Sequence, residues 1–319
     1  MSLKGQVALV TGASRGCGRG IAHQLGRAGA TVYITALREE NEDSIIQSLQ
    51  HKLPYLQQVA KEVDELGGQC IPIYCDHSDS KQIEELFRRI AFEQKGQLDI
   101  VVLNAFSAVT TMLTKMHSKF FDLPENIYDV CNETGVRFLP MPHPIISYRY
   151  LQLRGQYLTA RQAALLMVPR RKGLIVTISS PGGINYVFNV AYGINKAGCD
   201  RMAADMGIEL REFNVTSICL YPGPVRTELF TDDVGLLSKE AVAKTYANAE
   251  SIEFAGKCIV AMANDPKVHE KTGHILLTML LAKEYDLYDE DGRQPVCPIA
   301  VKYLDYIKEV NRVRSEISL

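Results

Sequence analysis

Short apolar runs alternate with helical patterns along most of this chain. The runs are rich in β-branched residues and cover 6–11, 31–35, 69–75, 99–103, 173–178, 214–220 and 274–278. Helical patterns such as 80–94, 161–167 and 193–211 lie between them. Buried strands that alternate with helices are typical of a parallel sheet covered on both faces. The sequence therefore predicts a single α/β domain with a doubly wound, mainly parallel, seven-stranded sheet.

Composition argues against several classes of protein. Hydrophobic residues make up 46% of the 319 residues and the net charge is −2, so nothing indicates a nucleic-acid partner. The eight cysteines form no CxxC pair, which indicates a reducing compartment and no metal site. The chain enters a strand almost at once, and its longest apolar stretch, 273–281, is too short to span a bilayer. We expect a cytoplasmic protein.

Two stretches interrupt the alternation, and a tail follows it. We interpret 38–52, which has a polar front half, and 136–152, which has prolines at every second position from 140 to 144, as insertions in a domain that covers 1–285. Residues 286–319 form a C-terminal extension with an amphipathic helical pattern near its end. The pattern leaves open whether this tail closes the domain, pairs with another subunit or touches a membrane surface, such as that of the endoplasmic reticulum.

A glycine-punctuated turn follows the first apolar run and opens the first helical pattern. Its sequence, 11–18, has the spacing Gly-x-x-x-Gly-x-Gly. Glycines there let the backbone turn tightly and approach a pyrophosphate, which rests on the N–H groups of the helix N-terminus. We expect a dinucleotide to contact the following residues of this turn: Gly12, Ser14, Arg15, Gly16, Cys17 and Gly18.

Tyr192 and Lys196 are spaced by one helical turn. Residues at i and i+4 share a helix face and lie about 5–6 Å apart at Cβ. An ammonium beside a phenol favours the tyrosinate and makes transfer of the phenolic proton easier near neutral pH. Such spacings also arise by chance on a solvated helix face, so the pair depends on its context.

These motifs together resemble the classical short-chain dehydrogenase/reductase family. The TGxxxGxG turn, the YxxxK pair and the strand end 178–180 carry the resemblance, which extends from residue 6 to about residue 278. The later segments 281–285 and 289–293 resemble one subfamily in particular. The resemblance implies a Rossmann fold, an NAD(P)-dependent oxidoreductase that acts on a small carbonyl or alcohol, and a homo-oligomer, either dimer or tetramer.

The resemblance also implies three catalytic roles. Ser180 would hydrogen-bond the substrate oxygen, with Ser179 as the alternative. Tyr192 would be the acid in reduction and the base in oxidation. Lys196 would hold the nicotinamide ribose and lower the pKa of Tyr192, while the cofactor supplies the hydride.

Further positions match the cofactor contacts of the family. They are Asp76 after the third strand, Asn104 after the fourth, and Pro222, Gly223, Val225 and Thr227 after the sixth. Asp76 also suits a plain strand-end turn. The family's NNAG element is altered, because Leu103 replaces its first Asn and Phe106 its Gly.

Charge near the adenosine ribose predicts the choice of cofactor. An acid at the end of the second strand would bind the 2′-hydroxyl of NAD, but 34–38 contains none. Arg15 and Arg38 suit a 2′-phosphate, because guanidinium groups match phosphate geometry. NADP(H) is therefore favoured over NAD(H).

The substrate prediction rests on the resemblance. It implies an apolar ketone or secondary alcohol, steroid-like or xenobiotic. Phe230, Leu236 and Leu237 would form a lid over it. Tyr186 and Phe188 would either line the pocket or belong to the core.

One expected residue is missing. The family places an Asn of the proton relay where this chain has Gly135, directly before the second insertion. This leaves two alternatives to a working enzyme with an intact insertion. The protein is a catalytically impaired relative that binds dinucleotide or a partner without turnover, or the native protein lacks 136–152.

Overall fold

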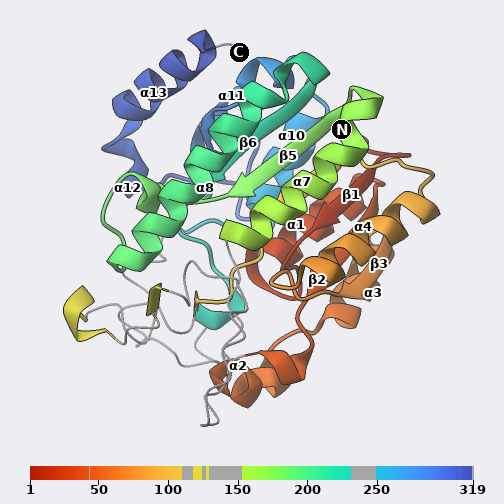
Figure 1. The fold of residues 1–319 in the computed structure, drawn as a ribbon. Helices are drawn as coiled ribbons and strands as arrows, with labels where there is room; N and C mark the ends of the chain where they lie inside the picture. The colour runs from red at the N-terminus through yellow and green to blue at the C-terminus, as the bar shows by residue number, and fades with distance from the viewer. Residues whose placement is uncertain (43, 110–117, 124–126, 129–152, 231–248, 318–319) are drawn as a thin grey trace, which may run out of the picture.

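A computed structural model describes residues 1–42, 44–109, 118–123, 127–128, 153–230 and 249–317 (Figure 1). All the predicted strands are present, each with ends within one residue or two of the expected ones. They are β1 (Val7–Val10), β2 (Thr31–Ala36), β3 (Gln69–Tyr74), β4 (Ile100–Leu103), β5 (Gly173–Ile178), β6 (Val215–Tyr221) and β7 (Ile275–Leu277).

The strands form one seven-stranded sheet in the order β3-β2-β1-β4-β5-β6-β7. Every pair of neighbours is parallel, so the predicted doubly wound Rossmann sheet is confirmed. The chain leaves β1 toward one edge and, from β4 onward, toward the other. This reversal opens a crevice at the carboxyl ends of β1 and β4, where doubly wound sheets bind ligands.

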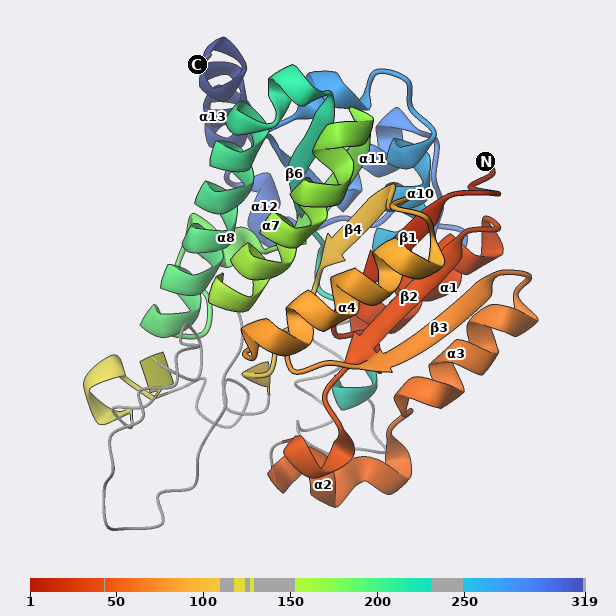
Figure 2. The same cartoon turned by 45° about the vertical axis from the view of Figure 1, so that its right-hand side comes forward.

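Helices cover both faces of the sheet (Figure 2). One apolar layer joins the sheet to α1 (Gly16–Arg27), α3 (Leu56–Glu65), α10 (Phe254–Ala263) and α11 (Thr278–Glu284). The opposite layer joins it to α4 (Ser80–Glu93), α7 (Leu153–Arg170) and α8 (Val190–Glu209). Because both faces are buried, the strands read as continuous apolar runs rather than as alternating ones.

The first predicted insertion is folded against the domain. It contains a 3-10 turn at Glu39–Asn41, the helix α2 (Ser44–Leu49) and a second 3-10 turn at Gln50–Lys52. Ile46 and Leu53 pack with Leu229, which follows β6. The insertion therefore lies over the carboxyl end of the sheet, beside the crevice. The second predicted insertion, 136–152, and Gly135 lie outside the described residues.

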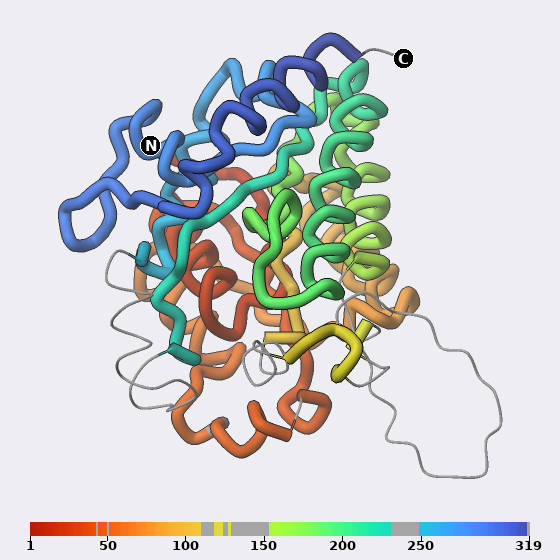
Figure 3. Tube along the Cα trace, turned by 90° about the vertical axis from the view of Figure 1, so that its left-hand side faces the viewer, coloured from red at the N-terminus to blue at the C-terminus, as the bar shows by residue number. Residues whose placement is uncertain are grey.

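The C-terminal tail packs along the edge of the sheet at β7 (Figure 3). Its helices are α12 (Pro298–Val301) and α13 (Leu304–Glu316), and Ile307 joins an apolar cluster with Tyr221 and Ile275. Asn311 accepts a hydrogen bond from the Ile275 N–H and donates one to the Ile275 carbonyl, each 2.8 Å long. One side-chain amide thus pairs the exposed edge of β7. Of the roles left open for the tail, the described contacts support closure of the domain.

In the part of the chain that the structure describes, no helix combines the length and the apolar character needed to cross a membrane.

The Asn311 amide gives a test of this edge. Asn311→Ala leaves both backbone groups of the buried Ile275 without this partner, so we expect the free energy of unfolding to fall by about 1–3 kcal/mol. Lys308→Ala, an exposed change on the same helix, should cost less than about 0.5 kcal/mol. Urea denaturation measures both, and equal losses in the two variants would contradict the pairing role.

Candidate active site

The turn between β1 and α1 requires glycine for conformation and for space. Gly12 and Gly16 have positive φ angles of 64° and 56°, where side chains are strained. A Cβ at Gly18 would stand 2.3 Å from the Gly12 carbonyl oxygen and 2.5 Å from Nδ2 of Asn104. Because Gly18 has no side chain, the Gly12 carbonyl and the Asn104 side chain can both approach the start of α1.

Asn104 joins the two strands that flank the crevice. Its Nδ2 donates to the carbonyls of Thr11 and Gly12, both at 2.9 Å, and its N–H donates to the Thr11 hydroxyl at 3.0 Å. These bonds hold the end of β4 against the glycine turn. Asn104 thus lies behind the turn, where it fixes the shape of the surface that we predicted a cofactor to use.

A carboxylate from the segment after β6 lies at the N-terminus of α1. Oε2 of Glu228 accepts the Gly16 N–H at 2.7 Å, and its Oε1 accepts from Arg19 at 3.0 Å. Helix N-termini favour anions because their N–H groups and the helix dipole point outward. The Glu228 carboxylate occupies this N–H and shows that the position accepts an anionic oxygen, so the turn fits the pyrophosphate of a dinucleotide.

The neighbouring positions of the turn have different surroundings. Cys17 lies in the first turn of α1, where burial raises the pKa of its thiol to about 12. Ser14 is buried and lines a cavity at the carboxyl ends of β2 and β3. The thiol therefore stays neutral. The cofactor contact expected of Cys17 would then use its backbone N–H rather than its side chain.

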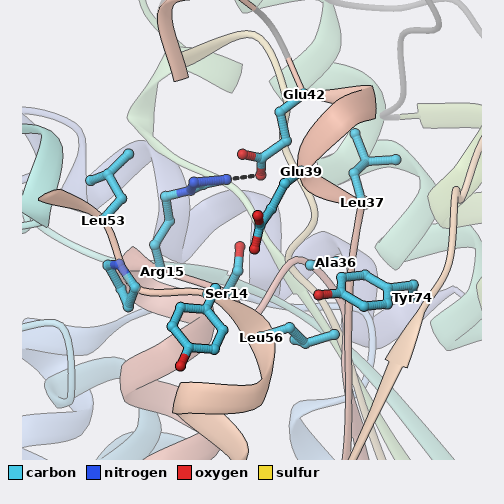
Figure 4. Close-up of a pocket in the computed structure, with 11 residues that line it drawn as sticks. Ser14, Arg15, Ala36, Leu37, Glu39, Glu42, Leu53, Leu56 and Tyr74 are labelled. Atoms are coloured by element: carbon cyan, nitrogen blue, oxygen red, sulfur yellow. Dashed lines mark hydrogen bonds and ion pairs between the residues drawn. The ribbon is translucent and has the colours of Figure 1, made fainter. Parts of the chain in front are cut away.

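That cavity lies where the adenosine end of a dinucleotide would bind (Figure 4). Its lining comes from the glycine turn, the ends of the two strands, the first insertion and the start of α3: Ser14, Arg15, Ala36, Leu37, Glu39, Glu42, Leu53, Pro54, Tyr55, Leu56 and Tyr74. Arg15 forms an ion pair with Glu42 of the insertion. Arg38 lies outside this lining and stacks on Tyr74, with its guanidinium carbon 4.9 Å from the ring centroid.

Asp76 is buried just after β3 and is also not among the residues that line the cavity. Its Oδ1 accepts hydrogen bonds from the N–H and the hydroxyl of Ser78, at 2.9 and 2.6 Å. The carboxylate thus shapes a turn at the end of the strand, as the alternative interpretation has it, and the contact to adenine stays a prediction.

The predicted catalytic side chains meet at the start of α8. Asn189 caps this helix, and its Oδ1 accepts the Tyr192 N–H at 2.9 Å. The hydroxyls of Ser180 and Tyr192 are 2.8 Å apart, and the Gly182 N–H donates to Ser180 at 3.0 Å. Ser179 instead donates to the Lys196 carbonyl at 3.3 Å. Ser180 is therefore the serine that contacts Tyr192.

Lys196 lies one turn along the same helix and is also buried. Its Nζ donates to the Ile178 carbonyl at 3.3 Å. The same nitrogen stands 4.9 Å from the ring centroid of Phe106, and that ring lies edge-on to Tyr192 at 5.9 Å. Phe106 replaces the last glycine of the family's NNAG element. Its aromatic face thus lies beside the Lys196 ammonium, and cation–π attraction stabilises that charge.

Burial is the largest influence on the Tyr192 phenol. It raises the pKa of Tyr192, while the Lys196 charge and the Ser180 hydrogen bond act in the opposite direction. Lys196 therefore offsets part of the pKa increase that burial causes. It lowers the pKa of Tyr192 as predicted, but its effect is smaller than that of burial. The raised pKa means that burial favours the protonated phenol over the tyrosinate.

The two aromatic residues ahead of α8 differ in position. Phe188 packs edge-on to Tyr192 with ring centroids 5.1 Å apart and has a positive φ of 61°. Tyr186 is 69% exposed, and its hydroxyl donates to the Phe188 carbonyl at 3.1 Å. Tyr186 is therefore no core residue, whereas Phe188 forms part of the wall around the Tyr192 phenol.

The segment after β6 is fastened to a buried glutamate. The Glu250 N–H donates to the Pro224 carbonyl at 2.8 Å, and the Arg226 N–H donates to the Glu250 carbonyl at 2.9 Å. A Cβ at Gly223 would come within 3.4 Å of the Glu250 carboxylate, and one at Gly16 within 3.3 Å of Thr227. These contacts place 222–227 between Glu250 and the glycine turn.

Glu250 also has an altered ionisation. Oε2 accepts from the Thr278 hydroxyl at 2.8 Å, and Oε1 has no hydrogen-bond partner among the described residues. Burial raises the pKa of Glu250 to about 8. Sequence reasoning missed Glu42, Glu228 and Glu250 because nothing local marks these acids. The one available signal is that Glu228 directly follows Thr227.

Comparison with known proteins identifies the family. A family model described as short chain dehydrogenase matches residues 6–130 and 147–234. The chain belongs to the short-chain dehydrogenase/reductase family. It is 41% identical over 300 residues to Dehydrogenase/reductase SDR family member 1 of Mus musculus and of Homo sapiens, which covers 91% of this chain and 85% of each relative. The subfamily predicted from 281–285 and 289–293 is that of this relative, and the identity confirms it.

Solved structures agree on the fold. A short chain dehydrogenase from Mycobacterium thermoresistibile superimposes with a TM-score of 0.70 at 23% identity and covers 93% of both chains. A Serratia marcescens short-chain dehydrogenase/reductase mutant superimposes with a TM-score of 0.64 at 22% identity and covers 87% of this chain and 97% of the other. As a member of this family, the protein is an NAD(P)-dependent oxidoreductase.

The ionisation of Glu250 gives a test in pH. A carboxyl with a pKa near 8 in the folded state and near 4.3 in the unfolded state binds more protons when folded. Its contribution to stability is therefore full below about pH 4 and is lost as the pH rises toward 8. Glu250→Gln should match the wild type near pH 5 and exceed its free energy of unfolding by at least about 1 kcal/mol at pH 8.5. Urea denaturation at both pH values measures this, and a pH-independent difference would contradict it.

Proposed function

We propose that the protein is an NADP(H)-dependent oxidoreductase that interconverts a carbonyl and a secondary alcohol on a small apolar substrate. The observation that carries the proposal is the 2.8 Å contact between the Ser180 and Tyr192 hydroxyls, with Lys196 one helical turn away. Two hydroxyls in contact can both reach a single substrate oxygen. A buried ammonium beneath them stabilises negative charge on the phenol.

Each of these residues has a defined task in the proposed reaction. Ser180, oriented by the Gly182 N–H, donates to the carbonyl oxygen and polarises it. Tyr192 gives its proton to that oxygen in reduction and accepts it in oxidation. Lys196 lowers the cost of the tyrosinate that forms and holds the nicotinamide ribose hydroxyls. The bound nicotinamide cofactor supplies or accepts the hydride.

The cofactor would lie across the crevice. In this proposal the glycine turn holds the pyrophosphate, and 222–227 lines the nicotinamide. The contacts that we propose are Gly12, Ser14, Arg15, Gly16, Cys17, Gly18, Arg38, Asp76, Asn104, Tyr192, Lys196, Pro222, Gly223, Val225 and Thr227. Asn104 contributes by shaping the turn, because its amide is engaged by the Thr11 and Gly12 carbonyls.

Two guanidinium groups support the preference for NADP(H). Arg15 lines the adenosine cavity, and Arg38 lies beside it on the Tyr74 ring, so both are within the region of the ribose 2′-position. A relative named NADPH-dependent aldehyde reductase 2, chloroplastic, from Arabidopsis thaliana is 28% identical over 76% of this chain. The name points to the same reduced cofactor.

An apolar wall around Tyr192 supports an apolar substrate. Its buried members are Ala108, Ile127 and Ala191, and Phe106, Leu123, Val187 and Phe188 pack against them. Phe230 is the described member of the proposed lid, and Leu236 and Leu237 lie outside the described residues. A relative named Hydroxysteroid dehydrogenase-like protein 2, from Danio rerio, is 26% identical over 93% of this chain, which fits a steroid-like or xenobiotic substrate.

The remaining parts of the proposal concern assembly and location. We place the protein in the cytoplasm, as a homo-oligomer whose subunits meet through the long helices α7 and α8. Tyr157 and Leu165 of α7 and Ile194 of α8 are large apolar side chains that these helices expose. Size-exclusion chromatography with light scattering distinguishes a monomer from a dimer or tetramer.

Tyr192→Phe tests the chemistry. It removes the transferable proton and leaves the ring packing, so we expect NADPH-dependent ketone reduction to fall by at least about 100-fold. The thermal shift produced by NADPH should persist, because the cofactor still binds. Tyr306→Phe, an exposed tyrosine of α13, should change neither quantity.

Two outcomes would count against the proposal. NADPH binding by the wild type without turnover on a broad panel of ketones would favour the catalytically impaired alternative. Turnover that survives Tyr192→Phe would assign the proton transfer to another group.

A further inference from the structure

We propose that Glu42, from the first insertion, is a cofactor-selectivity residue whose carboxylate competes with the ribose 2′-phosphate for Arg15 and so narrows the preference for NADP(H) over NAD(H). This inference rests on the proposed function, because it concerns the adenosine end of the same site.

The observation that carries it is an ion pair inside the adenosine cavity. Nη2 of Arg15 hydrogen-bonds Oε1 of Glu42, and the two side chains are only 20% and 12% exposed. Figure 4 shows Glu39 and Glu42 entering the cavity from the same short stretch of chain, with Arg15 facing Glu42. The guanidinium proposed for the 2′-phosphate is thus engaged by an internal anion.

Several contacts fix Glu42 in this place. The Glu42 N–H donates to the Glu39 carbonyl at 3.2 Å, and the Gln47 side chain donates to the Glu42 carbonyl at 2.8 Å. Gln47 belongs to α2, which packs through Ile46 on Leu229. The carboxylate is therefore held by the folded insertion rather than carried on an unanchored loop.

Charge decides what this contact does to each cofactor. A 2′-phosphate carries about two negative charges near neutral pH, so it gains from Arg15 only after it displaces Glu42, and it then lies near that carboxylate. A 2′-hydroxyl has no charge, and it can donate a hydrogen bond to a carboxylate. Glu42 therefore penalises NADP(H) and leaves NAD(H) unpenalised.

The position of Glu42 also bears on the missing acid at the end of β2. The end of β2, 34–38, contains no acid that would bind the ribose hydroxyls of NAD. The insertion returns an acid to the same cavity from a few residues further along the chain. Arg15, Glu39 and Glu42 line the cavity and Arg38 lies beside it on Tyr74, so these four side chains carry two positive and two negative charges.

Glu42→Gln tests the proposal on the full-length protein. The amide keeps the size and polarity of the side chain but removes its charge. We expect the Kd for NADPH to fall by about tenfold and the Kd for NADH to change by less than about twofold, as measured by isothermal titration calorimetry. Glu40→Gln, an exposed acid of the same turn, should alter neither Kd by more than about twofold. In an Arg15→Ala background, where the competition for the guanidinium is absent, Glu42→Gln should improve NADPH binding by a smaller factor than in the wild type.

The outcomes separate this inference from the function on which it rests. Equal changes in both Kd values, no change in either, or an unchanged effect in the Arg15→Ala background would overturn the selectivity role while the cofactor site stands. If neither the wild type nor any variant binds NADPH or NADH, the proposed function fails and this inference fails with it.

Discussion

The amide of Asn104 is the contact on which the geometry of the site depends. β1 and β4 are neighbours in the sheet, and the chain departs from them toward opposite edges. A further bond between the segments that follow them adds to the strand pairing at their carboxyl ends. Asn104 supplies it by donating to both Thr11 and Gly12, and Gly18 packs against that amide without room for a Cβ. The start of α1, the Gly16 N–H and the Arg15 side chain are all positioned from this point.

Acidic side chains from distant segments meet around that turn. Glu42 comes from the first insertion, Glu228 from the segment after β6, and Glu250 from the residues before α10. Each has a different physical setting: an ion pair with a guanidinium, a hydrogen bond from a helix N-terminus, and burial that keeps the carboxyl protonated up to about pH 8. A crevice that has to accept anionic phosphates is therefore surrounded by groups that have to be paired or neutral.

The sequence predicts the fold well because strands that are buried on both faces of the sheet have continuous apolar sequences, which can be recognised directly. β5 has the predicted bounds, and the glycine turn lies where its spacing places it. Helix ends are predicted less well. α8 begins at Val190 rather than Gly193 because Asn189 caps it. Gly193 lies inside the first turn of the helix, and a glycine there makes the true start hard to recognise from sequence. The pairing of Ser180 with Tyr192 follows from motif order, whereas Glu228 meets Gly16 across 212 residues, which no local pattern encodes.

The pairing of β7 by Asn311 bears on how the protein would aggregate. An edge that is satisfied by one side-chain amide is protected only while α13 stays docked, and terminal helices detach at a lower free energy than a core opens. A strand uncovered in this way offers its backbone to a strand of another molecule. Self-association on warming would then start from chains whose crevice and central sheet are still intact, and it would precede the cooperative loss of structure.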